Sequence, residues 1–295
     1  MPATTSSSGR VAVIALLVLS WGSTFAAVKV GLDSAPPLRF AGMRALAGGA
    51  VMTLAAAALG SDRPRLRDHT GVYLLLALLN VVLFFGLQTL AIGLLPSGLA
   101  AVLIYLQPVL VGLLAWPILG ERLTGGKVAG LLLGFGGIVA VSAGAFQGHA
   151  SGAGIGYAVG AALAWALGTV YFKTAAHRVP ALWAVGLPFL IGGSVLTVLG
   201  LVLEGGDVTW NAAFAVAFAY ASLVGTALSW FLWFSLVSSG QASRAATYVF
   251  FVPLVSLVIG ALGLGESLSV SLLVGAALVV AGVYLVNRPS GGNAA

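Results

Sequence analysis

Polar and aromatic side chains recur at helical spacing inside otherwise apolar stretches of this sequence. Asn80, Phe84 and Gln88 follow one another at four-residue intervals, which places them on one face of a helix. A polar group in a long apolar helix needs a partner, so this face indicates either a contact with another helix or the wall of a cavity. Amides and aromatic rings on a cavity wall suit a small, largely neutral solute that has an apolar part. We therefore expect recognition of such a solute.

The same types of side chain occur in several other apolar stretches. The candidate substrate-binding residues are Trp21, Thr24, Asn80, Phe84, Gln88, Tyr105, Trp165, Thr169, Ser229, Trp230, Trp233, Tyr248 and Phe251. Two structural alternatives stay open for them. Trp and Tyr are enriched at membrane interfaces, and Ser, Thr and Asn bridge neighbouring helices without touching a solute.

Groups that typically make or break covalent bonds are scarce in the sequence. There is no cysteine, and His69, His149 and His177 all fall between the apolar stretches. The sequence contains no Gly-x-Ser-x-Gly elbow, no His-Glu-x-x-His zinc motif and no Walker loop. We therefore expect no catalytic residue, no metal site and no cofactor, which disfavours an intramembrane enzyme. A channel is disfavoured because no charged ring or filter sequence is evident.

The composition places the elements that carry these residues in a membrane. The chain is 60% hydrophobic and only 7% charged, whereas about a quarter of the residues in a soluble domain are charged. A helix needs about 20 apolar residues to cross the bilayer. Windows of that length give ten predicted spans, at 11–31, 36–59, 71–93, 97–118, 125–145, 154–175, 180–203, 210–237, 241–264 and 269–287. The first run is long for a signal peptide, so we expect an uncleaved, all-α integral membrane protein.

Lysine and arginine are distributed unevenly over the predicted loops. With ten spans, the two ends of the chain and every second loop share one side. That side carries Arg10, Arg63, Arg65, Arg67, Arg122, Lys127, Lys173, Arg178, Arg244 and Arg288. The positive-inside rule then predicts that both termini are cytoplasmic, in the cytoplasmic (inner) membrane.

The same distribution bears on partners. Basic residues spread singly between apolar runs do not form the patch that nucleic acid needs, so nucleic acid is not expected as a partner. The expected partners are the lipid bilayer and a small-molecule substrate. The sequence gives no oligomeric state, and a monomer is compatible with it.

The second half of the sequence repeats landmarks of the first in the same order. The matched pairs are Trp21 and Trp165, Lys29 and Lys173, Pro36 and Pro180, Pro108 and Pro253, and Glu121 and Glu266. This pattern predicts two five-helix units, residues 1–148 and 149–295. Because each unit has an odd number of spans, the second copy must be inverted in the membrane. Inverted repeats place a substrate site near the bilayer midplane, between the copies, and permit alternating access.

Three further features belong to the predicted spans. Pro108 and Pro253 should each bend a helix, because proline removes a backbone hydrogen bond and clashes with the preceding turn; the two bends could act as hinges or simply shape a cavity. Arg44 lies inside a span and needs a partner, for which Asp33 is a candidate. The glycines of the fifth and tenth spans indicate close helix packing; they are Gly130, Gly134, Gly137, Gly275 and Gly282.

The run Trp21-Gly22-Ser23-Thr24-Phe25, Pro36-Pro37 with Arg44, and the Gly-Glu pairs that end the fourth and ninth spans carry a family resemblance. With these landmarks, essentially the whole chain resembles the EamA-type drug/metabolite transporter superfamily. The finer likeness is to bacterial exporters of aromatic amino acids, of the YddG type. The resemblance implies export and a cavity bounded by helices one, three, four, six, eight and nine.

Together these observations predict a secondary transporter that exports small metabolites by alternating access. The preferred substrates are amino acids, aromatic or large neutral ones in particular, and nucleosides or hydrophobic drugs remain the alternative. No Asp, Glu or His lies in the middle of a predicted span, although proton-coupled carriers usually place such a group in the pathway. Simple exchange of a cationic drug for a proton is therefore disfavoured.

Overall fold

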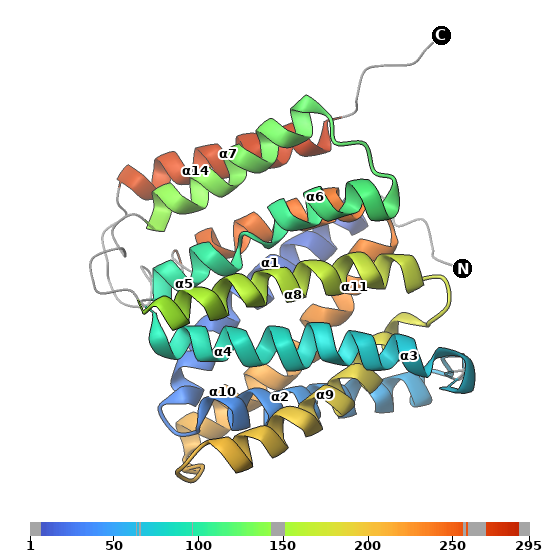
Figure 1. Ribbon diagram of the computed structural model, residues 1–295, viewed down its shortest axis with the longest axis vertical. Helices are drawn as coiled ribbons and strands as arrows, with labels where there is room; N and C mark the ends of the chain where they lie inside the picture. The colour runs from blue at the N-terminus through green and yellow to red at the C-terminus, as the bar shows by residue number, and fades with distance from the viewer. Residues whose placement is uncertain are drawn as a thin grey trace.

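The computed structural model describes residues 7–142 except 63, 65 and 96, and then residues 151–255, 258 and 270–288. Throughout this part of the chain the regular structure is helical, as predicted (Figure 1). The segments are α1 (Ser7–Leu32), α2 (Pro37–Ala58), α3 (Leu66–Leu76), η1 (Ala77–Leu83), α4 (Phe84–Leu94), α5 (Ser97–Ile104), α6 (Gln107–Leu119), α7 (Gly125–Ser142), α8 (Gly152–Ala175), α9 (Ala181–Leu203), α10 (Ala212–Ser222), η3 (Leu223–Leu228), α11 (Ser229–Ser238), α12 (Ala242–Thr247), η4 (Tyr248–Phe250) and α14 (Val270–Asn287).

Within the described residues, seven helices are long and apolar enough to cross a membrane. Three of these are composite: Leu66–Leu94 joins α3, η1 and α4, Val102–Leu119 joins the end of α5 to α6, and Ala212–Ser238 joins α10, η3 and α11. Three shorter apolar helices fall in the other predicted spans, namely Gly125–Ala140, Ala242–Val255 and Val274–Asn287. Large apolar side chains such as Leu54 and Val202 are largely exposed, as a lipid-facing surface requires. The chain is a multi-pass membrane protein; the count of ten and the inversion stay predictions.

Two pairs of helices that are far apart in sequence pack side by side at opposite edges of the bundle. α7 lies along α14 at one edge, and α2 lies along α9 at the other (Figure 1). Glycines bring both pairs into close contact: a Cβ on Gly130 of α7 would lie 2.6 Å from the carbonyl oxygen of Gly282 of α14. On the other edge, a Cβ on Gly193 would lie 2.8 Å from the backbone nitrogen of Leu46. These glycines hold the scaffold together, as close packing of small residues does in membranes.

Gly130→Ala should destabilise the protein, because backbone atoms of α14 leave no room for the added methyl group. Overpacking of this kind typically costs about 1–3 kcal/mol. Gly136→Ala is the matched control: it lies on the same helix, and a Cβ there meets nothing within 4 Å. Thermal unfolding in detergent should show a lower midpoint for Gly130→Ala and an unchanged or higher one for Gly136→Ala. Equal midpoints would contradict this packing.

Two π-helical segments interrupt the composite helices. They are η1 (Ala77–Leu83) and η3 (Leu223–Leu228). A π segment places about one extra residue in a turn and often occurs at functional sites. η1 lies against Gly192 of α9, and η3 lies against Gly48 of α2. Each π segment therefore packs on a helix from the other half of the chain.

The two prolines of interest follow interruptions in their helices. The chain turns at Tyr105 and Leu106 between α5 and α6, just before Pro108. In the second half, the 3-10 turn η4 separates α12 from the helical residues around Pro253. A proline cannot donate a backbone hydrogen bond to the carbonyl four residues earlier. In both halves, the residue that carries this carbonyl lies within the interruption or directly beside it. Whether these breaks act as hinges stays a proposal.

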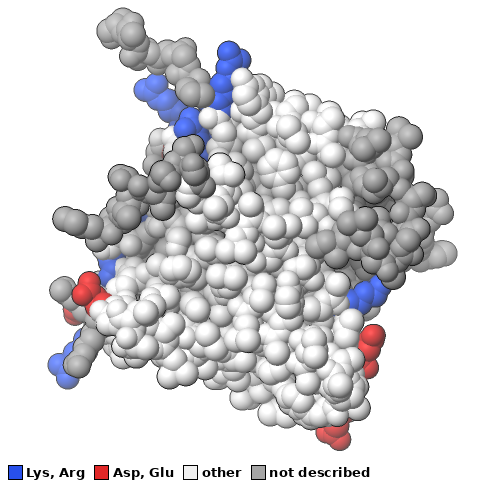
Figure 2. All heavy atoms as spheres, turned by 180° about the vertical axis from the view of Figure 1, so that it is seen from behind, with Lys and Arg blue, Asp and Glu red and all other residues white. Residues whose placement is uncertain are grey.

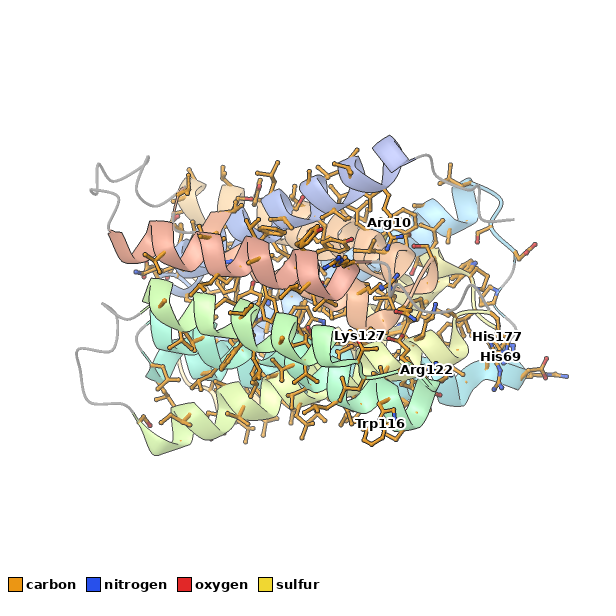
Figure 3. All side chains as sticks on the ribbon, turned by 90° about the horizontal axis from the view of Figure 1, so that it is seen from above. Arg10, His69, Trp116, Arg122, Lys127 and His177 are labelled. Atoms are coloured by element: carbon orange, nitrogen blue, oxygen red, sulfur yellow. The ribbon has the colours of Figure 1, made fainter. Side chains whose placement is uncertain are left out.

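Charged residues are concentrated toward the ends of the bundle. Most of the face seen in Figure 2 carries neither basic nor acidic side chains. We call the end where α1 begins and α14 ends the terminal side, and the other end the far side. Figure 3 shows Arg10, His69, Arg122 and His177 toward the terminal side.

Candidate functional site

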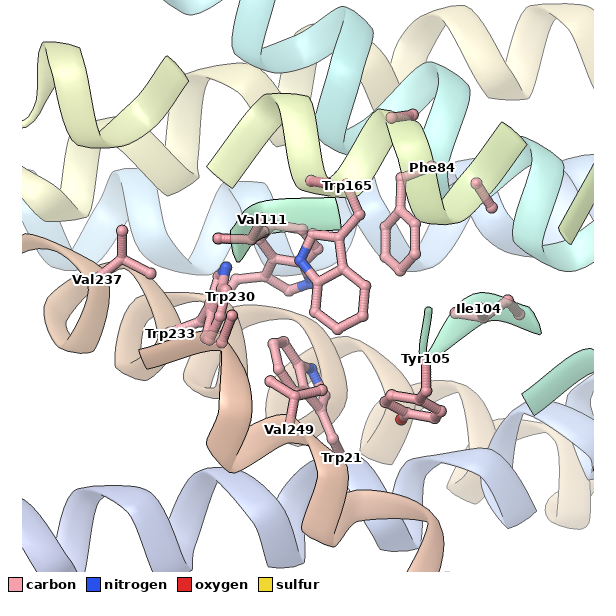
Figure 4. Packing of buried hydrophobic residues seen from close by; sticks show 14 of the residues in the cluster. Trp21, Phe84, Ile104, Tyr105, Val111, Trp165, Trp230, Trp233, Val237 and Val249 are labelled. Carbon is pink, nitrogen blue, oxygen red and sulfur yellow. The ribbon is translucent and has the colours of Figure 1, made fainter. Parts of the chain in front are cut away.

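Four tryptophans from three helices meet inside the bundle. Trp21 comes from α1, Trp165 from α8, and Trp230 and Trp233 from α11 (Figure 4). The ring centroid of Trp21 lies 5.3 Å from that of Trp165, 6.1 Å from that of Trp230 and 5.7 Å from that of Trp233. All four side chains are buried. Edge-to-face and tilted contacts at these distances contribute about 0.5–1.5 kcal/mol per pair beyond area burial. We call these four residues the tryptophan cluster.

Three further rings surround the tryptophan cluster. Phe84 of α4 lies 4.9 Å from Trp165, and its neighbour Phe85 lies 5.8 Å from Trp230. Tyr105, at the turn between α5 and α6, lies 6.3 Å from Trp165, below Phe84 in Figure 4. The sequence did not indicate Phe85. It lies in the first turn of α4, just after η1, and a π-helical turn shifts the faces of the helix that follows it.

A narrow cavity opens beside the tryptophan cluster. Its lining residues are Trp21, Thr24, Phe25, Val28, Arg44, Phe84, Phe85, Gln88, Ile92, Tyr105, Trp165, Gly225 and Trp230. Its volume of about 40 Å³ corresponds to about three water molecules, so a larger solute requires side chains to move. Val28 and Ile92 lie near the far-side ends of α1 and α4. The cavity therefore extends from the tryptophan cluster toward the far side, and both halves of the chain line it.

The structure brings seven of the predicted site residues to this cavity. They are Trp21, Thr24, Phe84, Gln88, Tyr105, Trp165 and Trp230. Trp233 lies in the tryptophan cluster but does not line the cavity. The binding role of each residue remains a proposal, since position alone does not test it.

Three other predicted residues lie between helices. The Asn80 amide packs on Gly168 of α8, where a Cβ would overlap it. Thr169 accepts a hydrogen bond from Gln107 Nε2 at 3.3 Å. The Ser229 hydroxyl donates to the carbonyl of Val224, five residues earlier, as π-helical geometry allows. The contacts of Asn80 and Thr169 match the helix-bridging alternative for polar residues in membranes, whereas the Ser229 bond stays within its own helix.

The last two predicted residues line a second, apolar groove. Tyr248 and Phe251 face residues of α1 across a space of about 510 Å³. The α1 residues of the groove are Val11, Ile14, Ala15, Val18 and Leu19. The Tyr248 hydroxyl donates to Asn287 Oδ1 of α14 at 3.0 Å. The sequence pattern showed the chemical type of these side chains but not which neighbouring helix they would face.

Several buried polar groups have no hydrogen-bond partner in the structure. Among them are the Trp165 and Trp233 indole nitrogens and both amide atoms of Asn80. An unsatisfied buried donor typically costs about 1–3 kcal/mol. Trp165 lines the cavity, but its indole nitrogen is itself buried. Within the described part of the chain, no group of three or more His, Asp or Glu side chains could hold a metal ion.

A cluster around Glu121 joins the two halves of the chain on the terminal side. The backbone N–H groups of Ala242 and Ser243 donate to its carboxylate at 2.6 and 3.2 Å, and the Ser243 hydroxyl does so too. Lys127 Nζ lies 3.6 Å from the same carboxylate and donates to Ser243 Oγ at 3.0 Å. The negative charge suits the N-terminus of α12. We call Glu121, Lys127 and Ser243 the terminal-side cluster.

On the far side, Glu204 binds the first residues of α2. Its carboxylate accepts from the backbone N–H groups of Leu38 and Arg39 at 2.7 and 3.1 Å. Lys173, back on the terminal side, donates to the carbonyl of Ser238 at 3.0 Å, whereas Lys29 is exposed. Neither lysine lines the cavity.

Comparison with known proteins identifies relatives over nearly the whole chain. The model of the EamA-like transporter family matches residues 10–143 and again residues 152–288. The uncharacterized transporter YvbV of Bacillus subtilis is 41% identical over 94% of this chain and 91% of its own length. A probable terminal-alkyne amino-acid exporter of Streptantibioticus cattleyicolor is 30% identical over 95% of this chain and 94% of its own. A solved crystal structure shares the fold, with a TM-score of 0.81 and 22% identity over 96% of this chain and 97% of that one.

Proposed function

The chain belongs to the EamA-like transporter family, and from this premise we propose that it exports amino acids, aromatic or large neutral ones in particular, by alternating access. That it is a membrane transporter, and not an enzyme, follows from the family. The substrate, the direction and the mechanism are our proposal, with the terminal side placed in the cytoplasm of an inner-membrane protein.

The observation that carries the substrate proposal is the ring-lined cavity between the halves. Trp21, Phe84 and Trp165 offer faces and edges for a flat apolar side chain, while Thr24 and Gln88 offer polar groups nearby. Sites for small molecules are typically apolar pockets with a few placed polar groups. The probable terminal-alkyne amino-acid exporter of Streptantibioticus cattleyicolor, similar to this chain along nearly its whole length, supports amino acids as the broader substrate class.

The alternation proposal rests on paired features of the two halves. The family model matches each half separately, and η1 and η3 each pack on a helix of the other half. The helix interruptions before Pro108 and Pro253 are paired as well. In this arrangement the terminal-side cluster closes one end while the cavity extends toward the other, as an outward-facing state would require. If two five-helix units in inverted orientation exchanged their conformations, the result would be the inward-facing state.

Purified protein in proteoliposomes provides the test. Vesicles preloaded with unlabelled phenylalanine should accumulate labelled phenylalanine, tryptophan or methionine by counterflow, and the rate should saturate with concentration. Labelled nucleoside should give a smaller signal. If no amino acid exceeds the empty-vesicle level, the substrate proposal fails, and if the flux never saturates, the carrier mechanism fails.

A further inference from the structure

The cavity contains one fixed positive charge, on Arg44 of α2. Its side chain lies within a membrane-spanning helix and is only 4% exposed. A buried charge is costly unless it is paired and hydrogen-bonded, so its surroundings should reveal a partner. Asp33, the partner considered from the sequence, is exposed and forms no ion pair in the described structure. Among the residues that the structure describes, no acidic side chain lines the cavity.

The contacts that Arg44 does make are weak. Its Nη2 points to Gln88 Oε1 at 3.5 Å, which is long for a hydrogen bond. Its guanidinium carbon lies 4.1 Å from the centre of the Phe85 ring, a cation–π contact. Its buried Nε has no hydrogen-bond partner. Most of the five N–H donors that an arginine carries are therefore unused.

Arg39, five residues earlier on the same helix, differs in that each guanidinium nitrogen has a hydrogen-bond partner. Its guanidinium donates to the carbonyls of Gly200, Glu204 and Gly206 at 3.3, 3.1 and 2.6 Å. It also lies 3.9 Å from the carboxylate of Asp207. Arg39 fastens α2 to the end of α9, whereas Arg44 points its donors at the cavity wall and finds no anion there.

We propose that Arg44 binds the carboxylate of the transported molecule, while the rings of the tryptophan cluster bind its apolar part. The inference rests on the proposed function and narrows it to substrates with a carboxylate. The planar guanidinium matches a carboxylate with two parallel hydrogen bonds, and the low-polarity surroundings strengthen that pairing. Substrate binding then supplies the counter-charge that the described lining residues do not provide.

This arrangement sets an order of preference among ligands. A carboxylate neutralises the guanidinium, a neutral ligand leaves it unpaired, and a cation without a carboxylate is repelled by it. Sites built around a polar group discriminate strongly against analogues that leave that group unpaired. Aromatic amines and cationic drugs should therefore bind poorly, although they fit the rings as well as an amino acid does.

Three ligands of matched size test the proposal: phenylalanine, 3-phenylpropionate, which has the carboxylate but no ammonium group, and phenethylamine, which has the ammonium group but no carboxylate. Binding to the purified protein can be followed by tryptophan fluorescence, because Trp21, Trp165 and Trp230 line the cavity. The variants are Arg44→Gln, which removes the charge, and Arg44→Lys, which keeps it without the planar fork. Arg39→Gln is the control, an arginine of the same helix outside the cavity.

The wild-type protein should bind both carboxylates at least about tenfold more tightly than phenethylamine, a difference of about 1.4 kcal/mol. Arg44→Gln should weaken both carboxylates by at least about tenfold without weakening phenethylamine, and Arg44→Lys should fall between. Arg39→Gln should keep the wild-type preference. Equal weakening of all three ligands by Arg44→Gln, or no carboxylate preference in the wild type, would overturn the proposal, as would the absence of carboxylate binding.

The proposal and the proposed function can fail separately. If 3-phenylpropionate binds through Arg44 but phenylalanine gives no counterflow, the amino-acid assignment is wrong and the carboxylate site stands. If phenylalanine is transported and Arg44→Gln leaves the ligand preference intact, the function stands and Arg44 has a packing role on Phe85 instead.

Discussion

Trp165→Ala should abolish transport. Trp165 contacts Trp21, Phe84, Tyr105 and Trp233, so its loss removes the ring at the centre of the tryptophan cluster. Each aromatic contact is worth about 0.5–1.5 kcal/mol, so a substrate ring that loses two such contacts would bind roughly 5- to 150-fold more weakly. Counterflow of labelled phenylalanine in proteoliposomes should drop to the empty-vesicle level.

This loss of transport must be distinguished from a loss of stability, because removing a buried tryptophan side chain typically lowers the free energy of unfolding by about 3–5 kcal/mol. Trp165→Phe keeps a ring and should retain part of the activity. Trp116→Ala is the matched control, since Trp116 is 61% exposed and points away from the bundle (Figure 3). The contradicting result is a Trp165→Ala protein that is folded, monodisperse in detergent and transports at the wild-type rate. It would show that the tryptophan cluster does not bind substrate.

Glu121→Gln should open the terminal side. Glutamine keeps the size of the side chain but leaves the buried Lys127 without its counter-charge. Breaking a buried ion pair typically costs about 3–5 kcal/mol, and the contact to the start of α12 weakens as well. Val237 lies fully buried in α11 beyond the tryptophan cluster. A cysteine placed there should react with a thiol reagent at least about tenfold faster in Glu121→Gln than in the parent.

No other thiol of the protein reacts with the reagent in this measurement, because the natural sequence contains no cysteine. Glu204→Gln is the matched control, since Glu204 binds a helix start on the far side and its loss should not accelerate the reaction. Replacing both partners, with Glu121→Gln and Lys127→Met, removes the unpaired charge and should restore slow reaction. An unchanged rate in the single variant would show that the terminal-side cluster does not hold this end closed.

The positions of the helices were largely predictable from the sequence. The predicted spans 36–59 and 180–203 agree with α2 and α9 to within a residue or two. Long apolar runs bounded by charge and turn residues determine such edges, because the bilayer sets the length of a helix. The packing role of the span-five and span-ten glycines was also predictable, since small residues allow backbones to approach.

The π segments were not predictable from the sequence. They explain why predicted site residues of one span face different neighbours. Asn80 lies inside η1, whereas Phe84 and Gln88 follow it. Four-residue spacing defines one face only in a regular α-helix, and the extra residue of the π turn breaks that register. Asn80 therefore packs on α8 while Phe84 and Gln88 reach the cavity.

Arg44 and Tyr248 illustrate a second limit of structure prediction from the sequence. Periodicity identifies the face of a helix but not the helix that lies opposite. Tyr248 thus faces α1 and α14, and Arg44 turns to the cavity, away from Asp33. The sequence did show that Arg44 lies within an apolar span and therefore needs a partner.

The central claim is that one ring-lined site between the halves is reached alternately from the two sides of the membrane. A single cysteine at Ile92, on the cavity wall, tests it most directly when a membrane-impermeant thiol reagent is added to right-side-out and to inside-out vesicles. We predict reaction from both sides, slowed on both sides by phenylalanine. Reaction from one side only, unaffected by any amino acid, would contradict the account.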